Sequence, residues 1–413
     1  MFEKTVLGNG IPVVIETAKE ARSVAIGIWV KVGSRNESFK ENGISHFLEH
    51  MFFKATEKRT SKDIAEEIDS LGGELNAFTS RETTTFYIKV LDEHIEKAIE
   101  LLTDIFLNST FPEEEIEKEK GIIFEEIKMV EDTPEDYVHD LFNKNIWREN
   151  GLGQSVLGRK ENIELFTRKD VLGQIKRYYS PKNIVVSCSG NFNENEMLER
   201  LNTGIGSMDR GYKLIEQVPP EFSGEINIIP KNLSEVHICL GLKGIPQASE
   251  SRYAMYLLNT ILGAGISSRL FREVREKRGL VYSIYSFNSS YFDTGLWGVY
   301  AGTGKKHVSE VIDLIISQFR GLPDSISAEE LKKGKSQLKG NLMLALESTS
   351  SKMINIAKQE IYYGRYFSPE DIINAVESVT LEELKDLSRQ LIDEHTFAMT
   401  VYGPVKKLKI RSV

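Results

Sequence analysis

The chain repeats itself, and this internal repeat constrains the fold more than any other feature of the sequence. A helix-like pattern at residues 93–106 returns at 306–319, a separation of 213 positions, with apolar residues at matching places. A strand-like run that ends in glycine at 183–190 returns at 396–403 with the same separation. The repeat therefore predicts two domains of similar fold.

The break between the two predicted domains falls near Gly204–Gly224, where prolines and glycines gather. We therefore expect one domain at residues 1–210 and a second, homologous domain at residues 222–413. Both halves mix alternating apolar runs with long helix patterns, which predicts an α+β fold: two sandwiches, each with an antiparallel-rich sheet covered by helices. In the first half the strand-like runs are 23–32 and 83–91, and the helix patterns are 93–108, 112–130 and 135–147.

Composition narrows the class of protein. With 413 residues, 40% hydrophobic and 27% charged, the chain has the balance of an ordinary globular protein. A net charge of -9 makes nucleic acid a poor partner, and no apolar run is long enough to span a membrane. The first residues lack the features of a secretion signal, and the two cysteines, Cys188 and Cys239, lie in apolar runs as expected for buried free thiols. We therefore expect a cytoplasmic protein without a membrane partner.

The segment His46–His50 carries the strongest chemical signal, because it reads His-Phe-Leu-Glu-His. On a helix, positions i, i+3 and i+4 share a face, so both histidines and Glu49 point the same way. Two neutral imidazoles suit zinc, and the carboxylate beside them is placed to take a proton from water at the metal. This order, HxxEH, is that of the inverzincins. The alternative is two histidines that merely pair within the fold, but the chain has only seven histidines and the intervening residues are apolar, which favours the metal.

A catalytic zinc needs a third protein ligand. The helix pattern at 112–130 offers Glu119 and Glu126, which lie two turns apart on one face, although spacing alone does not choose among its many glutamates. The repeat places Gly334 and Asn341 at the corresponding positions of the second half, and residues 255–259 opposite the HxxEH segment. Only the first half therefore carries the predicted metal residues.

Together these residues resemble the pitrilysin family of metallopeptidases, peptidase family M16, and in particular its short two-domain subfamily, which includes mitochondrial processing peptidase and small bacterial processing proteases. The resemblance covers essentially the whole chain and implies the LuxS/MPP-like metallohydrolase type of fold. It also implies one zinc ion per chain held by His46, His50 and Glu126, with Glu49 as the general base. Glu119 would support the site by orienting a ligating imidazole.

The resemblance extends to two further segments. In the second half it matches Arg275 and Tyr282, seven positions apart, and implies that they bind the substrate backbone and stabilise the oxyanion. In the short subfamily this pair reaches the zinc of the opposite subunit, which implies a homodimer. On residues alone, a basic surface helix beside a core tyrosine is the favoured interpretation of this pair. After two glycines, residues Asn76, Ala77 and Phe78 match a strand edge that pairs with the substrate chain, although such glycines also simply mark turns.

The predicted function is therefore a zinc-dependent endopeptidase that hydrolyses unstructured peptides or precursor segments inside a dimeric chamber. One alternative is a non-catalytic or partner-dependent scaffold subunit of a heterodimeric processing peptidase. Another is a metal-dependent hydrolase of a different class. Manganese or cobalt would also fit a ligand set of two histidines and a glutamate.

Overall fold

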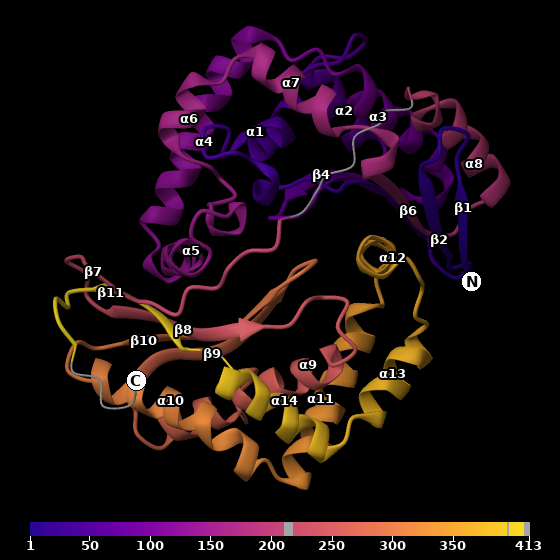
Figure 1. The fold of residues 1–413 in the computed structure, drawn as a ribbon. Helices are drawn as coiled ribbons and strands as arrows, with labels where there is room; N and C mark the ends of the chain where they lie inside the picture. Colours follow the sequence, from indigo (N-terminus) through magenta and orange to yellow (C-terminus); the bar gives the residue numbers. More distant parts are fainter. Residues whose placement is uncertain (210–217, 395, 409–413) are drawn as a thin grey trace. The chain divides into compact units, whose positions relative to one another are not determined.

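The computed structural model describes residues 1–209, 218–394 and 396–408, which form two compact units, each built on one β-sheet (Figure 1). The described residues of unit 1 fall within Met1–Met129, Gln154–Val218 and Ala345–Tyr366, and those of unit 2 within Val130–Gly153, Pro219–Leu344 and Phe367–Val413. The boundaries at 1–210 and 222–413 stay a prediction, and residues 210–217 of the predicted break lie outside the described residues.

Unit 1 contains a six-stranded sheet in which every pairing is antiparallel except that of β2 with β6. Successive side chains of a strand point to opposite faces, and on β3 both faces are apolar. Val24 and Ile26 enter one core, whereas Ala25 and Trp29 enter another on the opposite face. The strand order is β1 (Phe2–Val6), β2 (Pro12–Thr17), β6 (Ile184–Gly190), β3 (Ser23–Val30), β5 (Thr84–Leu91) and β4 (Glu74–Thr79).

The larger core of unit 1 lies beneath seven helices of the first half of the chain. These helices are amphipathic, and their apolar faces bury residues such as Phe47, Leu102 and Ile123 against the sheet and against one another. They are α1 (Ile44–Met51), α2 (Ser61–Ser70), α3 (Ile95–Asn108), α4 (Glu113–Glu131), α6 (Lys160–Leu165), α7 (Arg168–Tyr178) and α8 (Glu194–Thr203).

The second face of this sheet is covered by α12 (Thr349–Tyr363), a helix from the second half of the sequence. It lies beside β2 and β6 (Figure 1). It also contacts β3, where Met353 and Ile356 pack against Trp29. Gly27 permits this close approach, because a Cβ atom there would lie 2.6 Å from the sulfur of Met353. Unit 1 is thus completed by a segment far away in sequence.

Unit 2 repeats the architecture with a five-stranded sheet whose strand order matches β2-β6-β3-β5-β4 of unit 1. Its order is β7 (Ile226–Pro230), β11 (Ala398–Gly403), β8 (Val236–Gly244), β10 (Gly295–Thr303) and β9 (Val281–Ser290), and only β7 and β11 pair in parallel. The predicted α+β fold with two antiparallel-rich sheets is confirmed, and the shared strand order explains the repeat in the sequence.

Helices also cover both faces of the sheet in unit 2. One core gathers residues of α9 (Arg252–Gly263), α10 (Val308–Ser325), α11 (Ala328–Ala345), α13 (Pro369–Ser378) and α14 (Leu381–Glu394). The other face is packed by α5 (Pro134–Ile146), a helix of the first half, through Val138 and Phe142. Cys188 and Cys239 are both buried free thiols, as predicted. In the described part of the chain, we find no helix that combines the length and the apolar character needed to cross a membrane.

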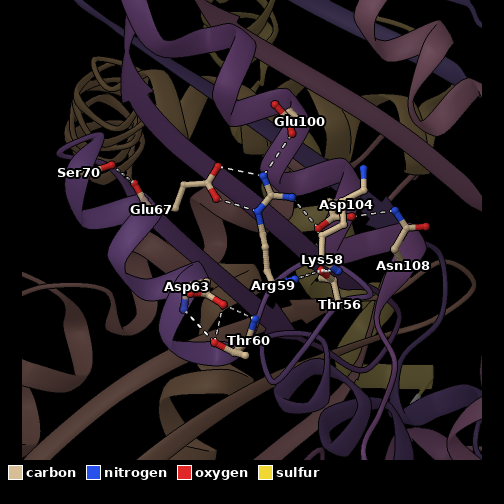
Figure 2. Close-up of polar contacts among 10 residues, drawn as sticks. All are labelled: Thr56, Lys58, Arg59, Thr60, Asp63, Glu67, Ser70, Glu100, Asp104 and Asn108. Carbon is tan, nitrogen blue, oxygen red and sulfur yellow. Dashed lines mark hydrogen bonds and ion pairs between the residues drawn. The ribbon is translucent and has the colours of Figure 1, made fainter.

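The chain that follows α1 is held by a partly buried arginine, Arg59 (Figure 2). Arg59 donates from Nε to Glu67 on α2, at 2.7 Å, and from Nη1 to Asp104 on α3, also at 2.7 Å. Asp104 accepts a further hydrogen bond from the hydroxyl of Thr56. Because charge-assisted hydrogen bonds are strong and directional, this network ties α2 and α3 to the segment that leaves α1.

A second buried ion pair joins Arg35 to Glu82, with 2.6 Å between Nη1 and Oε1 and only 2% and 6% of the side chains exposed. We expect Arg35→Met to lower the free energy of unfolding by about 3–5 kcal/mol, because the buried carboxylate of Glu82 would lose the positive charge of Arg35. Chemical denaturation followed by circular dichroism measures this. Lys62→Met is the control, since Lys62 and Glu66 are exposed and their pair is worth at most about 1 kcal/mol. If the two variants unfolded at the same midpoint concentration of denaturant, the prediction would be contradicted.

Candidate active site

Helix α1 carries the segment His46–His50, and a buried carboxylate fixes where this helix begins. Glu37 accepts hydrogen bonds at 2.7 Å from the backbone N–H groups of Gly43 and Ser45, which would otherwise lack partners at the helix start. Gly43 has a φ of 102°, and a Cβ atom there would lie 2.8 Å from the Cα of Gly158. The helix start is therefore specified by a glycine and a glutamate rather than by the usual serine or threonine cap.

The next face of the site is built by α4. Ile116, Glu119 and Ile123 are buried on this helix, whereas the side chain of Glu126 is 37% exposed. The spacing of three and four residues puts these side chains on one face, which turns toward α1. From positions two turns apart on this face, Glu119 contacts Nδ1 of His50, whereas Glu126 approaches both histidines.

The two histidines and Glu126 converge on one point. The Nε2 atoms of His46 and His50 lie 3.7 and 3.6 Å from the same oxygen, Oε2, of Glu126. All three potential ligand atoms lie within 4.8 Å of one another, and no other such group of histidine, cysteine and carboxylate side chains occurs in the described residues. Three ligands of a tetrahedral zinc ion, each about 2.0–2.2 Å from it, would lie roughly 3.4 Å apart, so the observed spacing fits a shared metal ion.

The surroundings shift the pKa values of the two histidines in opposite directions. Burial, reinforced by the neighbouring His50, lowers the pKa of His46 to about 3, so that its ring is neutral. Burial also opposes the charging of His50, but its hydrogen bond to Glu119 and the surrounding carboxylates outweigh this and raise its pKa. Burial raises the pKa of Glu49. Carboxylates gathered around two imidazoles are a suitable environment for a divalent cation.

Glu119 lies behind His50 and is only 2% exposed. Its Oε1 is 2.7 Å from Nδ1 of His50, and its Oε2 pairs with the ammonium group of Lys54 at 2.5 Å. Although burial opposes ionisation, these two partners lower the pKa of Glu119. A carboxylate that accepts the Nδ1 proton leaves the lone pair of Nε2 free to bind a metal.

Glu49 is the remaining polar residue of the motif, and it does not point at the same ligand position. Its Oε2 accepts a hydrogen bond of 2.5 Å from the hydroxyl of Thr79, the last residue of β4. Glu49 thus lies between the histidines in sequence and beside a strand in space. This is a suitable position for a base that acts next to a metal without binding it.

Strand β4 forms an edge of the sheet in unit 1, because in the described residues it pairs only with β5. Asn76, Ala77 and Phe78 pair with Tyr87, Phe86 and Thr85 on that side, which leaves the other edge of the backbone unpaired by a strand. An open edge is able to accept an extended peptide as an additional strand. The predicted substrate role of these three residues stays a prediction that this placement supports.

Arg275 and Tyr282 lie in unit 2. Arg275 belongs to a π-helical turn, η6 (Phe271–Glu276), and its guanidinium lies 4.9 Å from the ring centre of Phe271. Tyr282 stands near the start of β9 with 64% of its surface exposed. Both side chains are thus available at the surface of their unit, and Tyr282 is not the core tyrosine of the alternative interpretation. Their catalytic role stays a prediction.

Three residues of the site were missed in the sequence: Glu37, Lys54 and Thr79. Glu37 lies in a loop, where a lone glutamate gives no pattern, and Lys54 follows the apolar end of α1. Thr79 offered a signal, since it stands two residues after Ala77 on a strand and therefore shares its face.

Comparison with known proteins places the chain among peptidases. A family model described as insulinase, peptidase family M16, matches residues 12–160, and one described as the peptidase M16 inactive domain matches residues 165–338. A Bacillus subtilis protein described as the uncharacterized zinc protease YmxG is 42% identical over 98% of both chains. An uncharacterized zinc protease of Streptomyces coelicolor is 36% identical over 98% of this chain and 90% of its own.

Solved structures show the same fold at lower sequence identity. A crystal structure from Pseudomonas fluorescens, described as a peptidase M16 inactive domain, superposes with a TM-score of 0.92 at 19% identity and covers 99% of both chains. A protease from Helicobacter pylori superposes with a TM-score of 0.89 at 22% identity, over 98% of this chain and 99% of that one.

Proposed function

The chain belongs to peptidase family M16, and from this premise we propose that it is a zinc-dependent endopeptidase that cleaves unstructured peptides or precursor segments. The observation that carries the proposal is the convergence of the Nε2 atoms of His46 and His50 on one oxygen of Glu126, with Glu49 beside them. Membership of the family supports peptidase activity, and the geometry supports the assignment of its residues.

The donor set fits zinc. Burial keeps His46 neutral, and Glu119 holds the proton of His50 at Nδ1, so both Nε2 atoms have lone pairs for a metal. The more exposed carboxylate of Glu126 supplies the third ligand, and three protein ligands are typical of a catalytic rather than a structural zinc site. When bound, zinc would lower the pKa of a water molecule and polarise the peptide carbonyl.

Glu49 is proposed as the general base. Its carboxylate would take the proton of the attacking water and then deliver it to the nitrogen of the departing amine. Burial raises the pKa of Glu49, which brings it closer to the range in which a carboxylate both accepts and returns a proton. The open edge of β4, with Asn76, Ala77 and Phe78, would hold the peptide in an extended form. Such pairing contacts the backbone of the substrate and therefore tolerates many sequences.

Arg275 and Tyr282 are proposed to donate hydrogen bonds to the oxyanion and the substrate backbone. We propose that in a homodimer this pair completes the active site of the opposite subunit, within a chamber that admits only flexible chains. Two exposed donors on unit 2 are consistent with a role outside their own core. An unstructured peptide of any origin, including a precursor segment, would be a substrate.

A non-catalytic scaffold subunit is the alternative. It would need neither a complete ligand set nor a base held in place by a hydrogen bond. The grouping of His46, His50 and Glu126 and the hydrogen bond of Glu49 to Thr79 support the presence of both. We therefore favour the active enzyme. Cleavage of a flexible peptide by the purified chain alone would separate the two functions, because a scaffold subunit would require a second protein.

Mixing two inactive variants tests the shared active site. We expect Glu49→Gln and the double variant Arg275→Ala/Tyr282→Phe each to be inactive alone, since loss of oxyanion donors costs about 10²–10³-fold in rate. Co-expressed, they should recover about one quarter of wild-type activity, because half of the dimers are mixed and one of their two sites is intact. Peptide cleavage by the mixed sample measures this. If the pair acted within its own chain, every site would carry a defect and no activity would return.

A further inference from the structure

We propose that Thr79 is a positioning residue for peptide hydrolysis, whose hydroxyl group holds the carboxylate of Glu49 so that one oxygen faces the reacting water. This inference rests on the proposed function, because it takes Glu49 as the base. It goes beyond that proposal by naming the residue that orients the base and the part of the fold that orients this residue in turn.

The direction of the Thr79 side chain follows from strand geometry. On β4, Leu75 and Ala77 pack against the core beneath α1, and alternation puts Thr79 on the same face. Its Oγ1 lies 2.5 Å from Oε2 of Glu49. An ionised carboxylate only accepts hydrogen bonds, so the hydroxyl donates. This hydroxyl contact involves Oε2, and we infer that the second oxygen, Oε1, is the one that accepts the proton.

The turn that follows Thr79 is fixed by the backbone. The N–H of Ser80 donates to the carbonyl of Thr83 at 2.7 Å, which closes the β4–β5 turn. From the loop before α1, the N–H groups of Ser34 and Arg35 donate to the carbonyls of Ser80 and Arg81, at 3.2 and 2.8 Å. The two segments touch so closely at Gly33 that a Cβ atom there would lie 2.2 Å from the oxygen of Ser80.

A buried charge network holds the same turn from another side. Glu82 in the turn pairs with Arg35 at 2.6 Å and accepts a hydrogen bond of 2.9 Å from the hydroxyl of Tyr362 on α12. Arg35 also donates to the carbonyl of Val218, at 3.2 Å. Thr79 therefore precedes a turn that is tied to the loop before the motif helix and to the helix of the second half that covers this sheet.

The expected kinetic effect follows from these contacts. The hydroxyl of Thr79 hydrogen-bonds the base and, among the described residues, none of His46, His50 and Glu126, so it should influence the reaction step rather than zinc binding or substrate affinity. Without it, the carboxylate would spend less time in the productive orientation, and small errors in the position of a catalytic group reduce the rate strongly. We expect kcat to fall about 10- to 100-fold, the size of a lost hydrogen bond to a charged group.

The test compares three variants by steady-state cleavage of one flexible peptide, with zinc content and melting temperature measured for each. Thr79→Val keeps the shape and the branched side chain but removes the hydroxyl, so kcat should fall about 10- to 100-fold with KM changed less than about threefold. Thr79→Ser keeps the hydroxyl and should lie within about threefold of wild type. Thr85→Val, on β5, removes a buried hydroxyl that has no partner in the described residues and should be unchanged.

The outcomes separate this inference from the function beneath it. Wild-type kcat in Thr79→Val, equal losses in the valine and serine variants, or loss of zinc from Thr79→Val would each overturn the positioning role. If Thr79→Val does not fold, Thr79→Ala takes its place. Its kcat should fall by the same factor, and Thr79→Ser should again restore activity close to that of the wild type. The proposed function is tested separately by Glu49→Gln. A fully active Glu49→Gln protein would refute the assignment of Glu49 as the base. An inactive Glu49→Gln protein together with a fully active Thr79→Val protein would overturn only the role of Thr79.

Discussion

Replacing Glu49 with glutamine should reduce peptide hydrolysis by about 10²–10⁴-fold while zinc stays bound. Glutamine has the same size and still offers an oxygen to the hydroxyl of Thr79, but it accepts no proton at neutral pH. The ligand atoms of His46, His50 and Glu126 are untouched by this change. The variant therefore separates proton transfer from metal binding.

The measurement is the rate of cleavage of a flexible peptide together with the zinc content of the purified protein. Glu66→Gln, an exposed residue on α2, removes the same charge far from the histidines in sequence and should cleave at the wild-type rate. Near-normal cleavage by Glu49→Gln would contradict the assignment of the base. Loss of zinc from this variant would instead show that Glu49 supports the metal.

Replacing Glu126 with alanine should abolish both zinc binding and activity. Removing an outer residue that orients a ligand typically weakens metal binding about 10- to 100-fold, so removal of a ligand itself should cost more than about 100-fold. The fold should persist, because the side chain of Glu126 is partly exposed, unlike the buried pair of Arg35 and Glu82. The melting temperature without metal should therefore match that of the metal-free wild type.

Zinc titration and peptide cleavage measure this second effect. The neighbouring residue provides the control: Glu125 lies on the same helix with 74% of its side chain exposed and pairs with Lys128. Glu125→Ala should bind zinc and cleave peptides as the wild type does. A Glu126→Ala protein that retains one tightly bound zinc ion, or a Glu125→Ala protein that loses it, would show that the third ligand lies elsewhere.

Periodicity predicted three long helices of the first half closely. The patterns at 93–108, 112–130 and 135–147 correspond to α3 (Ile95–Asn108), α4 (Glu113–Glu131) and α5 (Pro134–Ile146). An amphipathic pattern shows that a face is buried but does not say against which sheet. This is why the placement of α5 in unit 2 and of α12 in unit 1 could not be read from the sequence, although their apolar faces could.

The sequence also predicted that His46, Glu49 and His50 share one face of a helix, since positions i, i+3 and i+4 do so whatever surrounds the helix. The choice between Glu119 and Glu126 was not, because both lie on the same face of one helix. Tertiary structure separates them: Glu119 is buried behind Nδ1 of His50, whereas Glu126 faces the Nε2 atoms of both histidines. Thr79 reaches Glu49 only because β4 lies against α1, and no local pattern reports that contact.

The most direct test of the account is cleavage of one flexible peptide by the purified chain in three states: as isolated, after removal of metal with a chelator, and after zinc is returned. The account predicts about one zinc ion per chain, cleavage in the first state, loss of cleavage in the second and recovery in the third. Cleavage that continues without metal would contradict the zinc site, and a protein that holds zinc at His46, His50 and Glu126 yet cuts no peptide would contradict the enzyme and support the scaffold subunit.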